Sequence, residues 1–298
     1  MRRWVTIIGL AAVSAVALAG CSVPAGTDGN LVDDWPAVGE PKMIVPTAGV
    51  CYAAKPGATW DATTDQPVPC TTSHAVETIY VGSYTGDAAK RTTTPPAGGP
   101  EQRAAYATCS QKANDFLGAD WHTGLVMVNL VEPDNPAWKG GARWFRCDVM
   151  STDGYTFKYQ MVSWSLKDGL RGARSLANTC FDATETSDGR LGEMRPVDCA
   201  KPHRGEFAGL YTAPTGAYPG DNDKNDPAES GCEHVVGKYV GSAWGRRSDL
   251  GWFWNYYNEN QWELGDRTVL CYAVAFNGEH TRLYRGTLKN IGSAPLKS

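Results

Sequence analysis

The feature that most constrains this chain is an internal duplication, which the spacing of its cysteines reveals. Residues of the same or a similar kind recur at constant offsets of 129, 123 and 124 positions. Offset 129 relates Cys51, Tyr52, Cys70, His74 and Glu77 to Cys180, Phe181, Cys199, His203 and Glu206. Offset 123 relates Cys109, Phe116, Gly118 and Trp121 to Cys232, Tyr239, Gly241 and Trp244. Offset 124 relates Trp138, Gly141, Arg143, Cys147 and Gly154 to Trp262, Gly265, Arg267, Cys271 and Gly278. Constant offsets separated by small length changes indicate a duplicated domain with loop insertions.

The larger change of offset falls in residues 86–100 and 212–225, which are rich in glycine and proline, as surface loops are. Both copies close on a similar tail, Ser165-Leu166-Lys167 and Thr287-Leu288-Lys289. We therefore expect two similar domains, over residues 46–169 and 175–292.

Within each copy, the residue pattern predicts a small antiparallel sheet with one packed helix. The expected strands are residues 76–84, 125–131 and 143–150 in the first copy, and 206–211 and 268–276 in the second. The second copy's helix is expected to start at Asp226, because an Asx cap is followed by proline and then by Glu229, and to end at Gly241. The first copy's helix is expected over Glu101–Leu117. The predicted fold class is α+β, a tandem duplication stapled by disulfides.

The chain has nine cysteines, and setting Cys21 aside leaves an even number, as expected in an oxidising compartment. Duplication favours the same pairing in both copies. The preferred pairing closes a hairpin-sized loop with one bridge and clips the helix to the last strand with the other. It comprises Cys51–Cys70, Cys109–Cys147, Cys180–Cys199 and Cys232–Cys271, while the spacing leaves other pairings within each repeat open.

The N-terminus has the pattern of a lipoprotein signal peptide. Arg2 and Arg3 precede an apolar run that ends in Leu18-Ala19-Gly20-Cys21. We expect residues 1–20 to be cleaved and Cys21 to carry a diacylglycerol, with residues 21–45 as a flexible tether. The expected location is the extracytoplasmic face of the cell membrane, with the membrane as a partner through the lipid. An ordinary signal peptide with an accidental cysteine is the alternative.

The repeated histidine and glutamate, His74 with Glu77 and His203 with Glu206, allow three interpretations. Cysteine and histidine in the order Cys-x3-His are zinc ligand types, but zinc would need reduced thiols, so we expect no metal. A carboxylate-oriented imidazole is a common catalytic base, although positions three apart on a strand point to opposite faces and would meet only across a turn. We favour the third interpretation, in which these residues are structural and bond backbone near the second cysteine.

Both copies also share the form Trp-x2-Gly-x-Arg-x3-Cys, with Trp138 and Arg143 in the first and Trp262 and Arg267 in the second. The tryptophan could stack on a sugar. We favour a structural role, in which the guanidinium packs over the indole at a turn that leads into a strand.

The copies differ most in one strand, which is aliphatic at residues 125–131 and aromatic at residues 250–257. As a strand, the aromatic segment places Trp252, Trp254 and Tyr256 on one face, and Phe253 and Tyr257 on the other. Because a sheet with one helix has one dry face, we expect part of this segment to be exposed as a candidate binding surface. Packing against the other copy or under a long loop is the alternative.

Net charge and the absence of catalytic motifs limit the partners and activities that we expect. The net charge of −4 disfavours nucleic acid as a partner. No Gly-x-Ser-x-Gly, His-Glu-x-x-His or Ser-x-x-Lys motif occurs, and the disulfide framework leaves no cysteine nucleophile. We therefore expect neither a catalytic residue nor a cofactor.

Several of these motifs together resemble the septum formation family of actinobacterial cell-envelope proteins. The resemblance rests on Cys199-Ala-Lys-Pro202-His203-Arg-Gly-Glu206 and on Trp262-Glu-Leu-Gly265-Asp266-Arg267 before Cys271. The first copy departs from the pattern, with Ser73 in place of proline and Ala142 in place of aspartate. The resemblance implies two copies of the family's domain in an envelope protein with a part in septum formation at cell division, and it implies no catalytic residues.

Two functions from different classes follow. The first is a lipid-anchored binding or scaffold protein of the cell envelope, whose partners are wall glycan or envelope and division proteins. The alternative is a wall-modifying hydrolase that uses His74 or His203.

Overall fold

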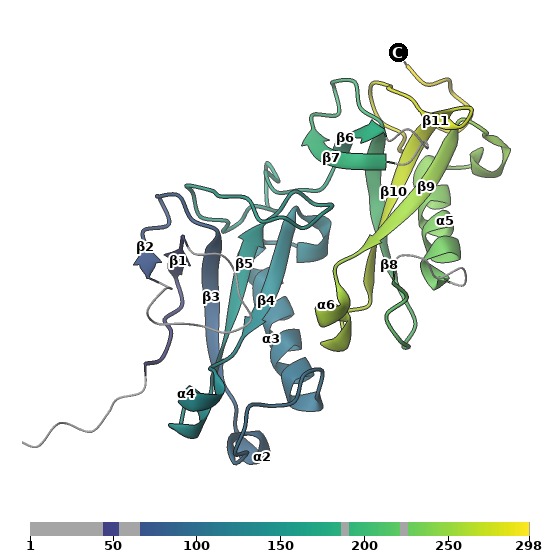
Figure 1. Ribbon diagram of the computed structural model, residues 1–298. Coiled ribbons are helices and arrows are strands. Elements are labelled where there is room, and N and C mark those ends of the chain that lie inside the picture. Colours follow the sequence, from purple (N-terminus) through teal and green to yellow (C-terminus); the bar gives the residue numbers. More distant parts are fainter. Residues whose placement is uncertain (1–43, 54–65, 186–190, 221–225, 298) are drawn as a thin grey trace, which may run out of the picture. The chain divides into compact units, whose positions relative to one another are not determined.

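The computed structural model describes residues 44–53, 66–185, 191–220 and 226–297 (Figure 1). The expected signal peptide, Cys21 and nearly all of the expected tether lie outside these residues. The described part contains two antiparallel sheets, one in each expected domain, each with a long helix on one face. The predicted α+β tandem duplication is therefore confirmed.

The first sheet has the strand order β2-β1-β3-β5-β4, and all its strand pairs are antiparallel. Its strands are β1 (Val50–Tyr52), β2 (Pro67–Val68), β3 (Val76–Ser83), β4 (Val126–Val131) and β5 (Trp144–Ser151). The hairpin of β1 and β2 lies at one edge of this sheet, and β4 lies at the other.

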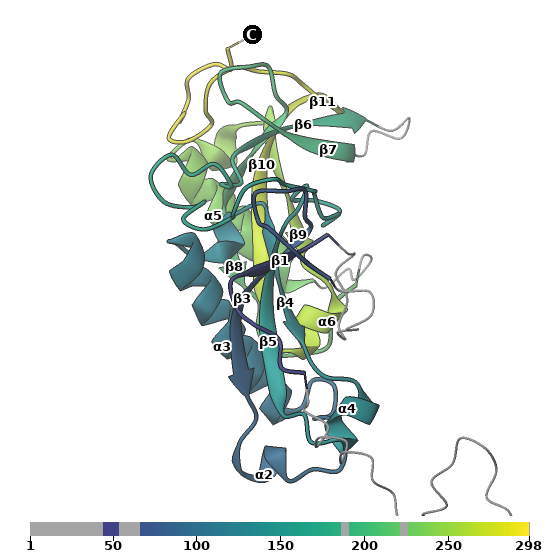
Figure 2. The ribbon, with the colours of Figure 1, turned by 90° about the vertical axis from the view of Figure 1, so that its left-hand side faces the viewer.

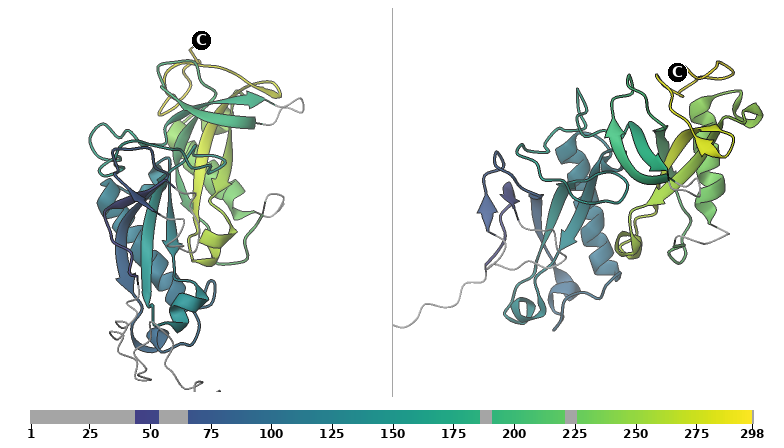
Figure 3. Two further views of the ribbon diagram at one scale, coloured as in Figure 1. Left: turned by 60° about the vertical axis from the view of Figure 1, so that its left-hand side comes forward. Right: turned by 45° about the horizontal axis from the view of Figure 1, so that its top comes forward.

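The second sheet repeats this order. Its strands are β6 (Cys180–Glu185), β7 (Leu191–Val197), β8 (Gly205–Thr212), β9 (Leu250–Tyr256), β10 (Thr268–Asn277) and β11 (His280–Thr281). The path β7-β6-β8-β10 continues to β9, which pairs with β10, and the short β11 also pairs with the end of β10. Figure 3 shows the hairpins β1–β2 and β6–β7 at the corresponding edges of their sheets.

The two long helices are α3 (Pro100–Leu117) and α5 (Pro227–Val240), and each lies along one face of its sheet (Figure 2). Their ends follow the predicted signals. Asp226 accepts a hydrogen bond from the Ala228 N–H at the start of α5, and Gly118 ends α3 with a φ of 89°, a conformation that favours glycine. The short helices are α2 (Gly86–Ala89), α4 (Asn135–Lys139), α6 (Glu259–Glu263) and the 3-10 turns η2 (Trp121–Thr123) and η3 (Trp244–Arg246).

The four expected cysteine pairs are joined in the structure. Cys51–Cys70 and Cys180–Cys199 each close the hairpin of their repeat, with a Cα–Cα distance of 5.2 Å. The other two bridges, Cys109–Cys147 and Cys232–Cys271, clip the long helix of each repeat to β5 or β10. The bridges therefore fix the sheet edge and the helix in the same way in both repeats.

The second sheet is dry on both faces, which corrects the expectation of a single dry face. Its helix face packs residues such as Val269, Ala273 and Ala275 against α5. Its other face contributes Tyr272 and Phe181 to a core that continues into the first repeat. That core also holds Trp121, Leu170 and the helix-facing side chains of the first sheet. The two repeats thus share one hydrophobic core.

The face of the first sheet opposite α3 differs from its counterpart because it carries charged side chains. Arg146 and Asp148 occupy the places of Leu270 and Tyr272, and both are buried. The Arg146 guanidinium donates to one Asp148 oxygen at 3.0 and 2.9 Å, and the Thr78 hydroxyl donates to the other at 2.6 Å. The first sheet therefore buries an ion pair where the second buries apolar side chains.

Candidate functional site

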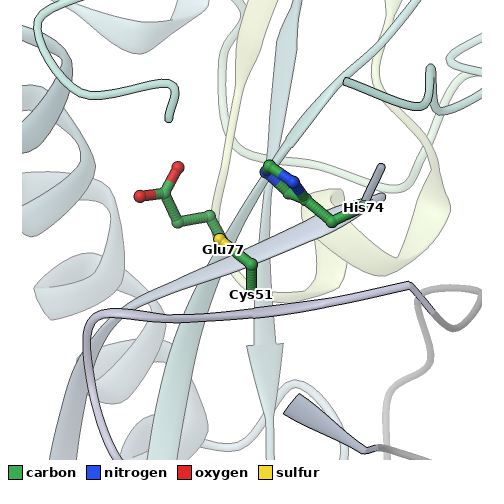
Figure 4. A group of neighbouring side chains, drawn as sticks. All are labelled: Cys51, His74 and Glu77. Carbon is green, nitrogen blue, oxygen red and sulfur yellow. The ribbon is translucent and has the colours of Figure 1, made fainter. Parts of the chain in front are cut away.

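The first histidine–glutamate pair lies in the interior of its repeat (Figure 4). His74 is fully buried, and its Nδ1 lies 2.7 Å from the Thr72 carbonyl oxygen. The Glu77 carboxylate accepts from the Ser165 hydroxyl at 2.7 Å and from the Leu166 N–H at 2.8 Å. Histidine thus bonds backbone near the second cysteine, as expected, but glutamate ties down the tail of the repeat instead.

The second pair makes the same contacts and adds more. His203 is fully buried with its Nδ1 2.7 Å from the Lys201 carbonyl oxygen, and its Nε2 lies 3.4 Å from Glu206 across the bend at Arg204. Two donors to the Glu206 carboxylate lie in the tail of the repeat, the Thr287 hydroxyl and the Leu288 N–H, each at 2.8 Å. Two tyrosine hydroxyls also donate to it, Tyr239 at 2.5 Å and Tyr284 at 3.0 Å. Burial raises the pKa of Glu206, but hydrogen bonds from His203 first, and then from Tyr239, Thr287 and the Leu288 N–H, outweigh it, and the pKa lies below its usual value.

Each pair also brings three metal ligand types together, with Cys51 or Cys180 as the third. The ligand atoms of each group lie within 4.8 Å of one another. The sulfurs belong to disulfides, however, and the carboxylates are held by protein donors. A zinc ion would require a reduced bridge, so the arrangement as it stands fastens the tail to the sheet.

The repeated tryptophan and arginine hold the two variable loops. The Arg143 guanidinium lies 4.3 Å from the Trp138 ring centroid, and Arg267 lies 4.0 Å from Trp262. The Trp138 Nε1–H donates to the Arg91 carbonyl, and the Trp262 Nε1–H donates to the Gly216 carbonyl, each at 2.9 Å. Each motif therefore pins the loop that contains residues 86–100 or 212–225.

The aromatic strand β9 is less exposed than expected. Tyr256 and Tyr257 are buried, and Trp252 and Trp254 are half-buried. The alternation of faces is as predicted, because Trp252, Trp254 and Tyr256 pack with α5, while Phe253 and Tyr257 pack with the shared core. Tyr257 contacts Trp121 of the first repeat, so it is an interface residue and not part of a binding surface.

A pocket of about 290 Å³ does open beside β9. It lies where the strand meets the pinned loop, and its lining residues are Tyr218, Gly220, Asp226, Phe253, Trp254, Asn255 and Tyr256. Asp226 joins the parts, since one carboxylate oxygen accepts from the Trp254 Nε1–H at 2.8 Å and the other from the Tyr256 hydroxyl at 2.5 Å. Aromatic rings beside a carboxylate and an amide form a surface of the kind that binds sugars or peptides.

A second polar cluster joins the repeats, and the sequence pattern does not predict it. The His122 Nδ1 lies 2.6 Å from Asp120, its Nε2 lies 3.0 Å from Asp266, and the Tyr106 hydroxyl donates to Asp266 at 3.1 Å. Burial lowers the pKa of His122, but the two carboxylates outweigh burial and raise it to about 9. The available signal was Asp266, which belongs to the repeated motif but is Ala142 in the first copy.

Comparison with known families identifies the chain. A family model for septum formation proteins matches residues 48–271, which include most of both repeats. The chain belongs to the septum formation family. The matched range contains both histidine–glutamate pairs and both tryptophan–arginine pairs, the residues on which the resemblance rested.

The family model is the comparison that supports this assignment. The searches of curated proteins and of solved structures each returned no match. Within the described residues, no helix of this septum formation protein has both the length and the apolar character needed to span a bilayer.

Proposed function

We propose that this septum formation family protein is a non-catalytic binding protein of the cell envelope, anchored by a lipid on Cys21. Family membership supports a role in septum formation or cell division. The N-terminal pattern Leu18-Ala19-Gly20-Cys21 supports the anchor, which places the protein on the outer face of the membrane.

The observation that carries the binding role is the pocket beside β9. The loop that contributes Tyr218 is pinned at Gly216 by Trp262, and Asp226 fixes Trp254 by a hydrogen bond. A pocket built from rings that are held in place binds with little loss of side-chain entropy. We propose wall glycan as its ligand, because sugar rings stack on aromatic faces while their hydroxyls bond carboxylate and amide groups.

The state of the two histidines supports a non-catalytic role over the hydrolase alternative. A catalytic base must reach the proton of a bound substrate or water. His74 and His203 are both fully buried, and each ring is bonded to a backbone carbonyl. Their contacts are those of residues that hold a turn.

The test is binding of the full-length, detergent-solubilised protein to isolated wall material. We expect Trp254→Ala to weaken binding at least about tenfold, because it removes one of the aromatic rings that line the pocket. Tyr218→Ala, which removes a half-buried ring next to the exposed residues 214–217, should weaken binding with a smaller effect on the melting temperature. The matched control is Trp164→Ala, since Trp164 is 43% exposed and lies in the first repeat, away from the pocket.

Two outcomes would contradict this proposal. One is normal wall binding by a folded Tyr218→Ala protein. The other is release of soluble wall fragments by the wild-type protein at a rate that His203→Gln abolishes, which would favour the hydrolase.

The lipid anchor is tested separately. We expect Cys21→Ala to release the protein from the membrane fraction or to leave an unprocessed precursor, because the acylated thiol is removed. Mass spectrometry of the mature N-terminus and membrane fractionation measure this. Unchanged mass together with unchanged membrane retention would refute the anchor.

A further inference from the structure

A second pocket, of about 370 Å³, lies between the repeats. Strand β4 of the first repeat forms one wall and helix α6 of the second forms another. Its lining residues include Met127, Val128, Asn129, Leu130, Gln261 and Glu263. None of them belongs to the pocket beside β9, so this is a separate site.

The wall formed by β4 is the open edge of a strand. Residues 127–130 all line the pocket, although successive side chains of a strand point to opposite faces. Four successive residues can line one pocket only along the strand edge. Within the described residues β4 pairs with β5 alone, so this edge lacks a strand partner. Such an edge offers backbone groups to an added strand.

The side chain of Gln261 lies against that edge and makes one long hydrogen bond to it. Its side chain is buried, its Nε2–H donates to the Val128 carbonyl at 3.4 Å, and its Oε1 has no hydrogen-bond partner among the described residues. A buried acceptor without a donor is unfavourable. A side-chain amide carries the same groups as a peptide bond, so Gln261 stands where the peptide group of an added strand would stand.

The charge of the pocket is of one sign. Glu132 and Glu263 line it, and no lysine or arginine is among the lining residues. The nearby Arg103 donates its Nε–H to the Glu263 backbone carbonyl at 2.8 Å, and it does not line the pocket. Amide groups of Asn129, Asn258 and Asn260 complete the walls. This combination favours a ligand that donates hydrogen bonds and carries positive charge.

We propose that this pocket binds a short extended peptide that bears an ammonium side chain. The peptide pairs with the edge of β4, its N–H replaces Gln261 on the Val128 carbonyl, and its ammonium group lies near Glu263. Residues 127–130 span roughly 10 Å of strand, which is enough for about three peptide residues. This activity is distinct from the binding of glycan beside β9.

The test uses the full-length protein and the peptide acetyl-Ala-Lys-Ala-amide, with affinity measured by calorimetry. The wild type should bind it. Glu263→Gln should weaken binding about fivefold, because it removes the exposed carboxylate at the pocket wall without disturbing a buried contact. The control is Glu259→Gln, an exposed glutamate on the same helix outside the pocket, which should leave affinity unchanged. The same peptide acetylated on the lysine side chain should bind the wild type more weakly than the unmodified peptide does. It should bind the wild type and Glu263→Gln equally, because it has no ammonium group to contact Glu263.

Hydrogen exchange tests the strand pairing itself. Val128 directs its carbonyl to the open edge, so the N–H groups of Val128 and Leu130, two positions on, face the same way. Both amides should exchange more slowly when the lysine peptide is bound. Equal affinity of the wild type and Glu263→Gln, no measurable binding by the wild type, or unchanged exchange at both amides would each overturn the proposal.

Discussion

At the scale of the residue, two equivalent glutamates show how the copies have diverged. Glu77 and Glu206 both bind the tail of their repeat. The second also accepts from Tyr239 and Tyr284. The equivalent of Tyr239 is Phe116, and that of Tyr284 is Val162, which bridges to His74 as Tyr284 bridges to His203; neither has a hydroxyl. Glu206 is therefore the centre of a larger network, and its negative charge is held by more donors than that of Glu77.

We expect Glu206→Gln to reduce the free energy of unfolding by about 2–3 kcal/mol, and Glu77→Gln to reduce it less. The amide nitrogen of glutamine would face donors where the carboxylate now accepts. Chemical denaturation of both variants measures the difference. Because the pKa of Glu206 is lowered by folding, its contribution is present above its unfolded pKa and is lost as the pH falls, so the gap between wild type and variant should narrow in acid.

Tyr239→Phe provides the matched control, because it gives the second copy the residue that the first copy has at Phe116. It should cost about 1 kcal/mol, since one hydrogen bond to the carboxylate is lost and the ring remains. If Glu206→Gln and Glu77→Gln proved equally costly, the extra donors would have no energetic weight.

At the scale of the element, the sequence predicted what local chemistry decides. The start of α5 followed from Asp226 and Pro227, and the alternation of faces in β9 followed from its period of two. The exposure of β9 did not follow, because the far face of the second sheet is covered by the first repeat. The short helices α4 and α6 were also missed, since five residues give too little periodicity to detect.

The candidate sites divide in the same way. The tryptophan–arginine contacts could be predicted, because they lie within one turn of the chain. The tie between Glu206 and Leu288 spans 82 positions, and the pocket beside β4 draws its walls from both repeats. Contacts of this kind depend on how the repeats pack, and one sequence does not encode that packing in a local pattern.

At the scale of the whole molecule, the cluster around His122 joins the two repeats. Its imidazole lies between Asp120 of the first repeat and Asp266 of the second. Folding raises the pKa of His122 to about 9 and lowers the pKa of both aspartates. The contribution of His122 is therefore complete below about pH 6.5 and is lost as the pH rises through 9, whereas that of the aspartates is lost in acid.

We expect the free energy of unfolding to fall by about 2–3 kcal/mol between pH 6.5 and 9, as His122 loses its proton between the two carboxylates. The neighbouring Tyr106 and Tyr257 have pKa values raised well above 10 in the folded protein, but tyrosines of the unfolded chain ionise near pH 10, so the series ends at pH 9. Denaturation at a series of pH values measures the slope.

The variant Asp266→Asn should remove most of this alkaline slope, because the imidazole then has one carboxylate. The control is Asp87→Asn, whose side chain is 96% exposed and should leave the slope unchanged. An alkaline slope that persisted in full in Asp266→Asn would show that His122 does not couple the repeats.

The buried ion pair of Arg146 and Asp148 affects whether a further repeat could pack onto the first one. Head-to-tail contacts between like units extend without limit unless one end is capped. The face of the second sheet opposite α5 is apolar, and its residues Leu270 and Tyr272 pack against the first repeat. The first sheet has a buried ion pair at the corresponding positions, so it lacks the apolar pair with which the second sheet packs on its neighbour. The far face of the first repeat therefore cannot dock on a further unit in the way that the second repeat docks on the first.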